Sequence, residues 1–385
     1  MPGDTKVTIY YGPLSWFEEK VGKKKKEGLL EAVFEHDEKS RQLRVMMPDP
    51  PEGAPIKPKR RKRLVAESGD YASLQVHAIT NFPGLIRAHN PHELHLHNPP
   101  EQVHEHLQRI FPESFAVLRY EYPSVTRETL VQVRDDFAEH LVGQEKVRDS
   151  LLAALYPLTR PARLKPVVVM FYGPSGVGKT ETAQFVNGLL GGALMRKQFS
   201  MFHNEKFASY LFGGSHSEAS FAHDLLDRES GVVLIDEFDK AASVFHSAFY
   251  QFFDGGIFQD KNYRADVGRA LIICTSNYAS DKEIREALGD ALHSRFDALI
   301  KFEPLTQAQT IAVIDRLVEA RVKEMESDER AVISEEEVKA LLYPLARNAS
   351  NVRKLGKLTD ELISTLLVEA VLADSEPSEV TDVGS

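Results

Sequence analysis

The sequence has very little cysteine and no long apolar segment. Cys274 is the single cysteine among 385 residues, which excludes an intramolecular disulfide framework and is typical of proteins kept in a reducing compartment. No apolar run approaches the roughly 20 residues that a membrane-spanning helix needs. The opening residues MPGDTKVTIYYG lack the basic and apolar segments of a signal peptide. We therefore expect a cytoplasmic protein rather than a secreted or integral membrane protein.

Positive charge is scarce over most of the chain. The net charge is −10, and because residues 1–120 carry +2, the rest of the chain carries −12. Sequence-independent binding to nucleic acid depends on Lys and Arg contacts to phosphates, so this acidic body disfavours nucleic acid as a partner. Two basic runs, Lys23–Lys26 and residues 57–63, are the exception. Such runs are most often solvated loops, but they leave open a contact with nucleic acid, anionic lipid, an acidic protein or an import receptor.

The residue pattern divides the chain into four parts. Residues 1–120 hold short β-branched and aromatic runs, which predict a β-rich N-terminal domain with a hairpin within 31–47. In residues 121–304 short apolar strands alternate with helical patterns, which predicts a parallel α/β sheet. Residues 305–372 are helical throughout, and the acidic tail 373–385 is predicted to be disordered. No internal repeat is evident.

Seven of the fourteen histidines lie within residues 77–106. On a strand His95 and His97 would share one face, and imidazole is a common zinc ligand. The absence of cysteine and the intervening Pro99 and Pro100 argue against a metal site. The alternative is a polar, pH-sensitive loop. The histidines considered as ligands are His92, His95, His97, His104 and His106.

The strongest local signal is a glycine-rich loop between a strand and a helix. GPSGVGKT at residues 173–180 follows the apolar run Val167–Tyr172 and opens a helical pattern, which is the context that the G-x-x-x-x-G-K-[ST] motif needs. The glycines let backbone N–H groups surround phosphate oxygens, Lys179 would reach the β- and γ-phosphates, and Thr180 would hold Mg²⁺. The expected ATP-binding residues here are Gly173, Pro174, Ser175, Gly176, Val177, Gly178, Lys179, Thr180 and Glu181.

Two further apolar strands end in polar residues. The run at 232–235 is followed by Asp236, which can face Mg²⁺ beside the phosphate loop, and by Glu237, which can orient and deprotonate the attacking water. The run that begins at Leu271 ends near Asn277, which could hold that water and contact the γ-phosphate. The Asp-Glu pair favours an enzyme that hydrolyses ATP over a switch that only binds it.

In this order the motifs resemble those of the AAA+ ATPases, and specifically the Clp-type unfoldases. The resemblance covers roughly residues 125–370 and rests on the phosphate loop, the Asp-Glu pair and three further segments. The first of these, HLVGQE at 140–145, resembles the family's VVGQ segment. It implies that Val142 and Gly143 contact adenine.

The other two segments carry arginines. SRFDALIKFEPLT at 294–306 resembles the segment in which the family places its arginine finger, which implies that Arg295 completes the site of a neighbouring subunit. NVRKL at 351–355 resembles the lid-domain G-A-R-x-L segment, which implies that Arg353 senses the nucleotide. In this family such sites form at the subunit interfaces of a ring, typically a hexamer.

The resemblance also implies a loop that grips polypeptide in the pore of the ring. The family carries an aromatic–hydrophobic–glycine loop between the first helix and the strand before Asp236, and the matching residues here are Tyr210, Leu211, Phe212 and Gly213. An aromatic beside glycine can hold an extended chain of any sequence. The interval Tyr278–Ser294 lacks the I-G-[FL] tripeptide of peptidase-docking relatives, so no peptidase partner is expected.

Together these patterns predict an α/β chain. It would hold a P-loop AAA+ parallel-sheet core and a small α-helical lid domain, behind a β-rich N-terminal domain that recruits a client or partner. The implied activity is Mg²⁺-dependent ATP hydrolysis that unfolds or remodels a protein client. Two alternatives stay open: an ATP-gated scaffold that displays the N-terminal domain, and a nucleic-acid-associated remodeller that uses residues 57–63.

Overall fold

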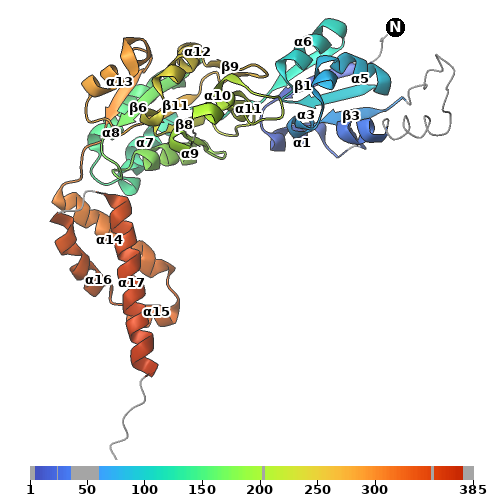
Figure 1. Cartoon of the computed structure of the whole chain (residues 1–385). Helices are drawn as coiled ribbons and strands as arrows, with labels where there is room; N and C mark the ends of the chain where they lie inside the picture. The colour runs from blue at the N-terminus through green and yellow to red at the C-terminus, as the bar shows by residue number, and fades with distance from the viewer. Residues whose placement is uncertain (1–4, 24, 36–59, 202–203, 348–350, 376–385) are drawn as a thin grey trace, which may run out of the picture.

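The structure, a computed structural model, describes residues 5–23, 25–35, 60–201, 204–347 and 351–375. Three parts follow one another along the chain (Figure 1). An N-terminal unit, drawn in blue to cyan, lies beside a central unit in green to light orange, and a helical unit in darker orange to red extends from the far end of the central unit. Within the described residues, every helix is too short or too polar to span a membrane.

The N-terminal unit is a parallel α/β sheet. Its five strands pair in the order β2-β3-β4-β1-β5, and every pairing is parallel. The α/β class is confirmed, but the expected β-rich unit with a hairpin is wrong, because short helices of five to ten residues make the connections. Residues 31–35 of the expected hairpin are helical, and its remainder lies outside the described residues. The elements are β1 (Lys6–Tyr11), α1 (Leu14–Val21), β2 (Glu27–Gly28), β3 (Arg63–Ala66), α3 (Ser68–Ala72), α4 (Val76–Thr80), α5 (Phe82–His89), β4 (Glu93–His97), α6 (Glu101–Ile110) and β5 (Phe115–Arg119).

The central unit contains the predicted parallel sheet, in the order β12-β6-β11-β8-β7, and a separate antiparallel pair, β9 and β10. The strands β6, β8 and β11 are fully buried, which explains their continuous apolar sequences. The elements are α7 (Arg127–His140), α8 (Glu145–Leu155), β6 (Val167–Tyr172), α9 (Lys179–Leu190), β7 (Met195–Gln198), α10 (Asn204–Phe212), α11 (Phe221–Leu226), β8 (Val232–Asp236), α12 (Tyr250–Gly255), β9 (Ile257–Gln259), β10 (Arg264–Asp266), β11 (Leu271–Thr275), α13 (Asp281–His293) and β12 (Ala298–Lys301).

The two parallel sheets have the same topology. Numbered by their order along the chain within each five-stranded sheet, the strands of both sheets run fifth, first, fourth, third, second. The sequence shows no repeat, so the repetition becomes visible only in the folded sheets.

The helical unit packs around a core of its own. Val313, Ile314 and Val338 are among its buried residues, together with Leu355 from the last helix. That helix continues to Ser375, beyond the predicted start of a tail at residue 373, and the rest of the tail lies outside the described residues. The elements are α14 (Gln307–Glu324), α15 (Ser327–Val332), α16 (Glu335–Leu342) and α17 (Val352–Ser375).

The N-terminal and central units share one continuous apolar core, which includes Tyr71 and Phe82 from the first unit and Phe221 and Phe258 from the second. Hydrogen bonds join the two surfaces near α10, α11 and the β9–β10 pair, which Figure 1 shows beside the N-terminal sheet. They include His216 Nε2 to the Leu74 carbonyl (2.7 Å) and Glu101 N to the Asn262 carbonyl (2.8 Å). The N-terminal unit is therefore docked firmly on the central unit.

The clustered histidines make hydrogen bonds inside the N-terminal unit. His97 is fully buried with Nε2 2.7 Å from the Gly12 carbonyl, and His104 Nδ1 lies 2.9 Å from the Tyr11 hydroxyl. Burial lowers the pKa of His97 to about 4. Over the described part of the chain, no group of three or more His, Cys, Asp or Glu side chains is arranged to hold a metal ion.

Candidate nucleotide-binding site

The glycine-rich loop has the geometry of a phosphate cradle. It joins the buried strand β6 to the helix α9, and Gly173, Gly176 and Gly178 have φ values of +130°, +79° and +104°, which favour glycine. A side chain at Gly173 would also overlap the carbonyl oxygen of Phe302. The loop therefore turns tightly and presents its backbone to the N-terminal end of α9, where anions are stabilised.

Lys179 begins α9 and points back under the loop. Its Nζ donates to the carbonyls of Gly173 (2.6 Å) and Pro174 (2.7 Å) and to Asn277 Oδ1 (3.2 Å). Burial lowers the pKa of Lys179 to about 8. The predicted lysine and asparagine therefore meet, and the ammonium has no carboxylate in direct contact among the described residues.

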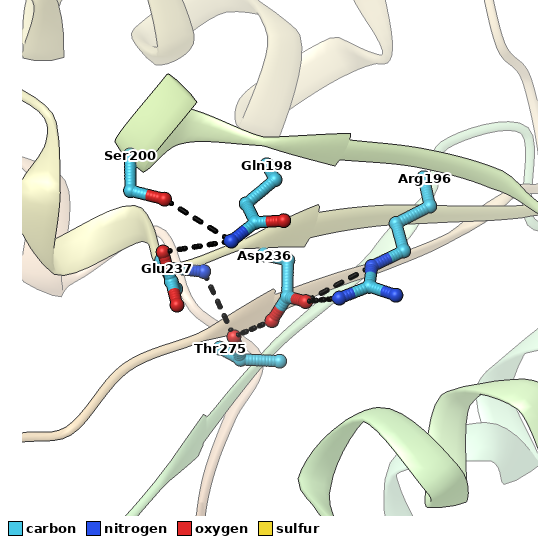
Figure 2. Close-up of polar contacts among 6 residues, drawn as sticks. All are labelled: Arg196, Gln198, Ser200, Asp236, Glu237 and Thr275. Atoms are coloured by element: carbon cyan, nitrogen blue, oxygen red, sulfur yellow. Dashed lines mark hydrogen bonds and ion pairs between the residues drawn. The ribbon is translucent and has the colours of Figure 1, made fainter. Parts of the chain in front are cut away.

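Asp236 ends β8 and Glu237 follows it, and their side chains point in different directions (Figure 2). Asp236 is 4% exposed, and its Oδ2 accepts from Arg196 Nε (3.0 Å) and Nη2 (2.5 Å), while its Oδ1 accepts from the Thr275 hydroxyl. Glu237 has the left-handed backbone conformation, with φ of +57°, which turns its side chain away from Asp236. Its Oε2 accepts from Gln198 Nε2 (3.1 Å). The Asp236 carboxylate is thus held at the strand end, whereas the Glu237 carboxylate lies apart from it, where it could take part in a proton transfer.

Sequence reasoning missed Arg196, Gln198 and Thr275. The two residues on β7 reach the acidic pair because β7 is parallel to β8, with Gln198 opposite Asp236. Thr275 ends β11, donates to Asp236 and accepts from the Glu237 N–H (3.0 Å). The run of three polar residues in MRKQ, in an otherwise apolar sheet, was the signal that could have identified the first two.

A cavity of about 540 Å³ opens between the central and helical units. Its volume is in the range of small-molecule and cofactor sites. Polar groups from the loop and from β8 lie on one side, and Leu305, Val313, Leu317 and Val352 line the helical unit's side. The predicted residues that line it are Val142, Ser175, Gly176, Val177, Gly178, Lys179, Thr180, Glu181, Asp236, Glu237, Asn277 and Arg353.

Contacts across the cavity tie the two units together. Val352, at the start of α17, donates its N–H to the Gly176 carbonyl (2.9 Å), which places Arg353 at the phosphate loop. Arg316 of α14, also missed, lines the cavity and donates to the carbonyls of Ala138 and Glu139 (both 2.9 Å). Gly143 does not line the cavity but accepts from Gln309 Nε2 (3.4 Å). A nucleotide in this cavity would therefore contact both the central and the helical unit, and the distance between these contacts depends on the angle between the two units.

Arg295 is the one predicted catalytic residue that does not line the cavity. It follows α13, where its Nε donates to Asp254 Oδ2 (2.9 Å) and its guanidinium lies 4.7 Å from the Tyr250 ring centre. Its side chain is 25% exposed. Within one chain it is therefore separate from the nucleotide site.

The expected gripping loop differs from the structure. Tyr210 and Leu211 lie in α10 and are 5% and 0% exposed, because this amphipathic helix packs them into the core. The Tyr210 hydroxyl donates to Asp224 Oδ2 (2.5 Å). Phe212 is 46% exposed, and its carbonyl accepts from the Lys261 N–H (3.0 Å). The prediction of an exposed loop is wrong for Tyr210 and Leu211, and Phe212 is the aromatic of this segment that solvent reaches.

A phosphate loop, a lysine, a buried aspartate and a separate glutamate around one cavity define a P-loop nucleoside-triphosphatase site. Comparison with known proteins narrows the class. Residues 165–344 match the profile of the AAA domain (Cdc48 subfamily). The chaperone protein ClpB of Chlamydia trachomatis serovar D is 28% identical over 303 residues, which cover 66% of this chain and 34% of that protein. The ClpA homolog protein of Fuscovulum blasticum is 28% identical over 221 residues, which cover 50% of this chain and 28% of that protein.

A solved structure has the same fold. It is the closed-state cryo-EM reconstruction of Hsp104 with ATPγS and FITC casein, which matches with a TM-score of 0.55 and 14% identity over 96% of this chain and 89% of that chain. Residues 165–344 therefore carry an AAA domain, and over about two thirds of its length the chain is similar to Clp-type AAA+ ATPases. It spans about a third of the length of the ClpB relatives that it matches.

Proposed function

We propose that this chain hydrolyses ATP in the cavity between the central and helical units and uses the energy to unfold or remodel a protein client. The observation that carries the proposal is the separate placement of Asp236 and Glu237 beside Lys179. Thr180 and Asp236 would hold Mg²⁺, which neutralises charge on the phosphates when it is bound. The composition and the buried Cys274 support a cytoplasmic location.

Each predicted residue has a distinct task in this proposal. Glu237 would leave Gln198 and take the proton of the attacking water, while Asn277 positions that water. Lys179 and Arg353 would stabilise the charge that develops on the γ-phosphoryl oxygens. Val142 and the apolar residues of α14 and α17 would pack on the base.

Arg295 motivates the second part of the proposal, a closed ring. It is partly exposed and remote from its own chain's cavity, so it would complete the site of a neighbouring chain, as the family resemblance implies. Head-to-tail contacts of this kind close into a ring, for which we propose six subunits. The ClpB relative is a chaperone protein, and the Hsp104 structure holds FITC casein, which supports a protein client.

The test uses Glu237→Gln, which should bind ATP but hydrolyse it at least 100-fold more slowly, because the general base is lost. The full-length variant is incubated with ATP, its mass is measured by light scattering, and copurifying proteins are identified. Glu237→Gln combined with Phe212→Ala is the matched comparison. Release of the captured proteins by Phe212→Ala supports movement of polypeptide. Full ATPase activity in Glu237→Gln would contradict the assigned hydrolytic site.

An ATP-gated scaffold is the second candidate, and the burial of Tyr210 and Leu211 favours it because it leaves little of the expected gripping loop exposed. In that case the captured proteins stay bound when Phe212 is replaced. Of the described part of the basic run, Arg61 pairs with Glu27 and Glu35, and Arg63 with Glu93, so these arginines are engaged inside the N-terminal unit. Residues 57–59 lie outside the described residues.

A further inference from the structure

The N-terminal and central sheets match in register as well as in strand order. In each sheet, the residue after the fourth strand (β4 or β11) donates its N–H to the second-last residue of the first strand (β1 or β6). The residue after the fifth strand (β5 or β12) donates its N–H to the last residue of that first strand. The matched bonds are Asn98 N to Tyr10 O (2.9 Å) with Ser276 N to Phe171 O (2.9 Å), and Tyr120 N to Tyr11 O (2.8 Å) with Phe302 N to Tyr172 O (2.8 Å). These bonds align Gly12 with Gly173, the first residue of the phosphate loop.

The two turns begin alike and then differ. Gly12 and Gly173 both have positive φ (+153° and +130°), and both precede proline. In the central unit the residues from Gly173 to Gly178 separate the strand from its helix, whereas in the N-terminal unit α1 begins at Leu14, directly after Pro13. The N-terminal turn is therefore too short to surround a phosphate group.

The side chains around the N-terminal turn complete its closure. The Gly173 carbonyl accepts from the Lys179 ammonium, but the Gly12 carbonyl is paired with the buried groups His97 Nε2 (2.7 Å) and Asn98 Nδ2 (2.9 Å). Asn98 Oδ1 in turn accepts from the Gly12 N–H (3.1 Å). The carbonyl that faces a phosphate-binding lysine in one unit is thus held by neutral groups in the other.

A carboxylate from the central unit lies at the start of α1. The carboxylate of Asp227, which follows α11, lies beside the Leu14 N–H, and its Oδ1 is 3.7 Å from His97 Nε2. The first N–H groups of a helix attract anions. In the central unit the corresponding helix start, at Lys179, faces the nucleotide cavity.

We propose that the N-terminal unit is a copy of the nucleotide-binding sheet that takes no nucleotide, and that the Asp227 carboxylate occupies the place of its phosphate and docks the two units. In this unit the start of the first helix, which could bind a phosphate, instead contacts a carboxylate of the same chain. The proposal does not depend on whether the protein moves polypeptide. It requires one nucleotide per chain and a docked α1 in every nucleotide state.

The first experiment counts bound nucleotide on the full chain. Equilibrium dialysis of Glu237→Gln with radiolabelled ATP and Mg²⁺ should saturate at one nucleotide per chain. Lys179→Ala should bind none at the concentration that saturates the parent. A second nucleotide per chain, or one equivalent retained by Lys179→Ala, overturns the closed N-terminal site.

The second experiment measures docking by hydrogen exchange of the full chain without nucleotide. Asp227→Ala should raise the exchange of the amides from Leu14 to Phe17 by about tenfold, because the negative charge beside the first N–H groups of α1 is lost. Asp227→Asn keeps a hydrogen-bond acceptor, its amide oxygen, and should raise the exchange of these amides less. Glu218→Ala, which removes an exposed carboxylate between α10 and α11, is the control and should leave it unchanged. Equal protection of α1 in Asp227→Ala and the parent overturns the docking role.

Discussion

Arg196 and Asp236 form an ion pair across neighbouring strands, at the position where the proposed function requires a metal ligand. The guanidinium contacts one oxygen of Asp236 through Nε and Nη2, and the Thr275 hydroxyl contacts the other (Figure 2). The carboxylate is nearly fully buried and the arginine is 38% exposed. Because the guanidinium occupies Oδ2, a cation that binds this oxygen competes with the arginine.

Arg196→Gln should therefore lower the Mg²⁺ concentration needed for tight nucleotide binding. Removal of the competing guanidinium leaves a buried carboxylate with a stronger attraction for cations, so we expect a three- to tenfold decrease, about the effect of one ion pair near a protein surface. Mg²⁺ is titrated against the fluorescence of a bound nucleotide analogue, in a Glu237→Gln background that prevents hydrolysis.

Lys197→Gln is the matched control for this prediction. It removes the next cation on β7, which pairs with Asp224 rather than with Asp236. Its Mg²⁺ requirement should equal that of the parent. An unchanged or higher Mg²⁺ requirement in Arg196→Gln would show that the arginine does not compete with the metal.

Nucleotide affinity should fall as the pH rises through the pKa of Lys179. Burial lowers that pKa to about 8 when the site has no nucleotide, and bound phosphate favours the charged form and raises the pKa again. The bound state then holds more protons than the free state above pH 8, so affinity decreases with pH. We expect about tenfold weaker binding at pH 9 than at pH 7.

The measurement is the dissociation constant of a fluorescent ATP analogue with Mg²⁺ at both pH values. Lys179→Arg is the control, because a guanidinium stays protonated throughout this range and should give nearly constant affinity. A parent protein whose affinity is equal at pH 7 and pH 9 would contradict the role given to the Lys179 charge.

The local motifs were sufficient to predict residues that line one cavity, but they were not sufficient to predict contacts between distant segments. The phosphate loop and the Asp236–Glu237 pair are encoded within a few residues at a strand end, where the sequence pattern is strong. Arg196 and Gln198 could not be assigned, because their partners are set by the β7–β8 register rather than by neighbours in sequence. Tyr210 looked like a mobile aromatic but is fixed by Asp224, fourteen residues further along the chain.

The N-terminal unit was mispredicted for a related reason. Its helices α3 and α4 have five residues each, too few for a helical period to emerge from the sequence. The basic and proline-rich residues between β2 and β3 also interrupt the alternation of strand and helix. What identifies the sheet is the pairing of five separate strands, which depends on the folded chain as a whole.

Gly173→Ala should destabilise the fold as well as the site. The new Cβ would overlap the Phe302 carbonyl, and the positive φ is unfavourable for alanine, so we expect a loss of about 2 kcal/mol in the free energy of unfolding. Gly188→Ala in α9 is the control, since its Cβ meets no atom within 4 Å. It should stabilise the protein by about 0.5–1 kcal/mol. Urea denaturation compares the two variants, and equal stabilities would contradict the tight turn at Gly173.

If Arg295 acts on the site of a neighbouring chain, two inactive variants should restore activity when mixed. Arg295→Ala retains a complete cavity but lacks the finger, and Lys179→Ala retains the finger but lacks a working cavity. Loss of an arginine finger costs about 10³-fold or more in rate, so each variant alone should be nearly inactive. In a random equal mixture, half of the chains have a working cavity and half of those have a neighbour with the finger. ATPase activity should therefore recover to about a quarter of the parent value in a closed ring. No recovery after denaturation and joint refolding of the two variants, with rings present by light scattering, would place the action of Arg295 within its own chain.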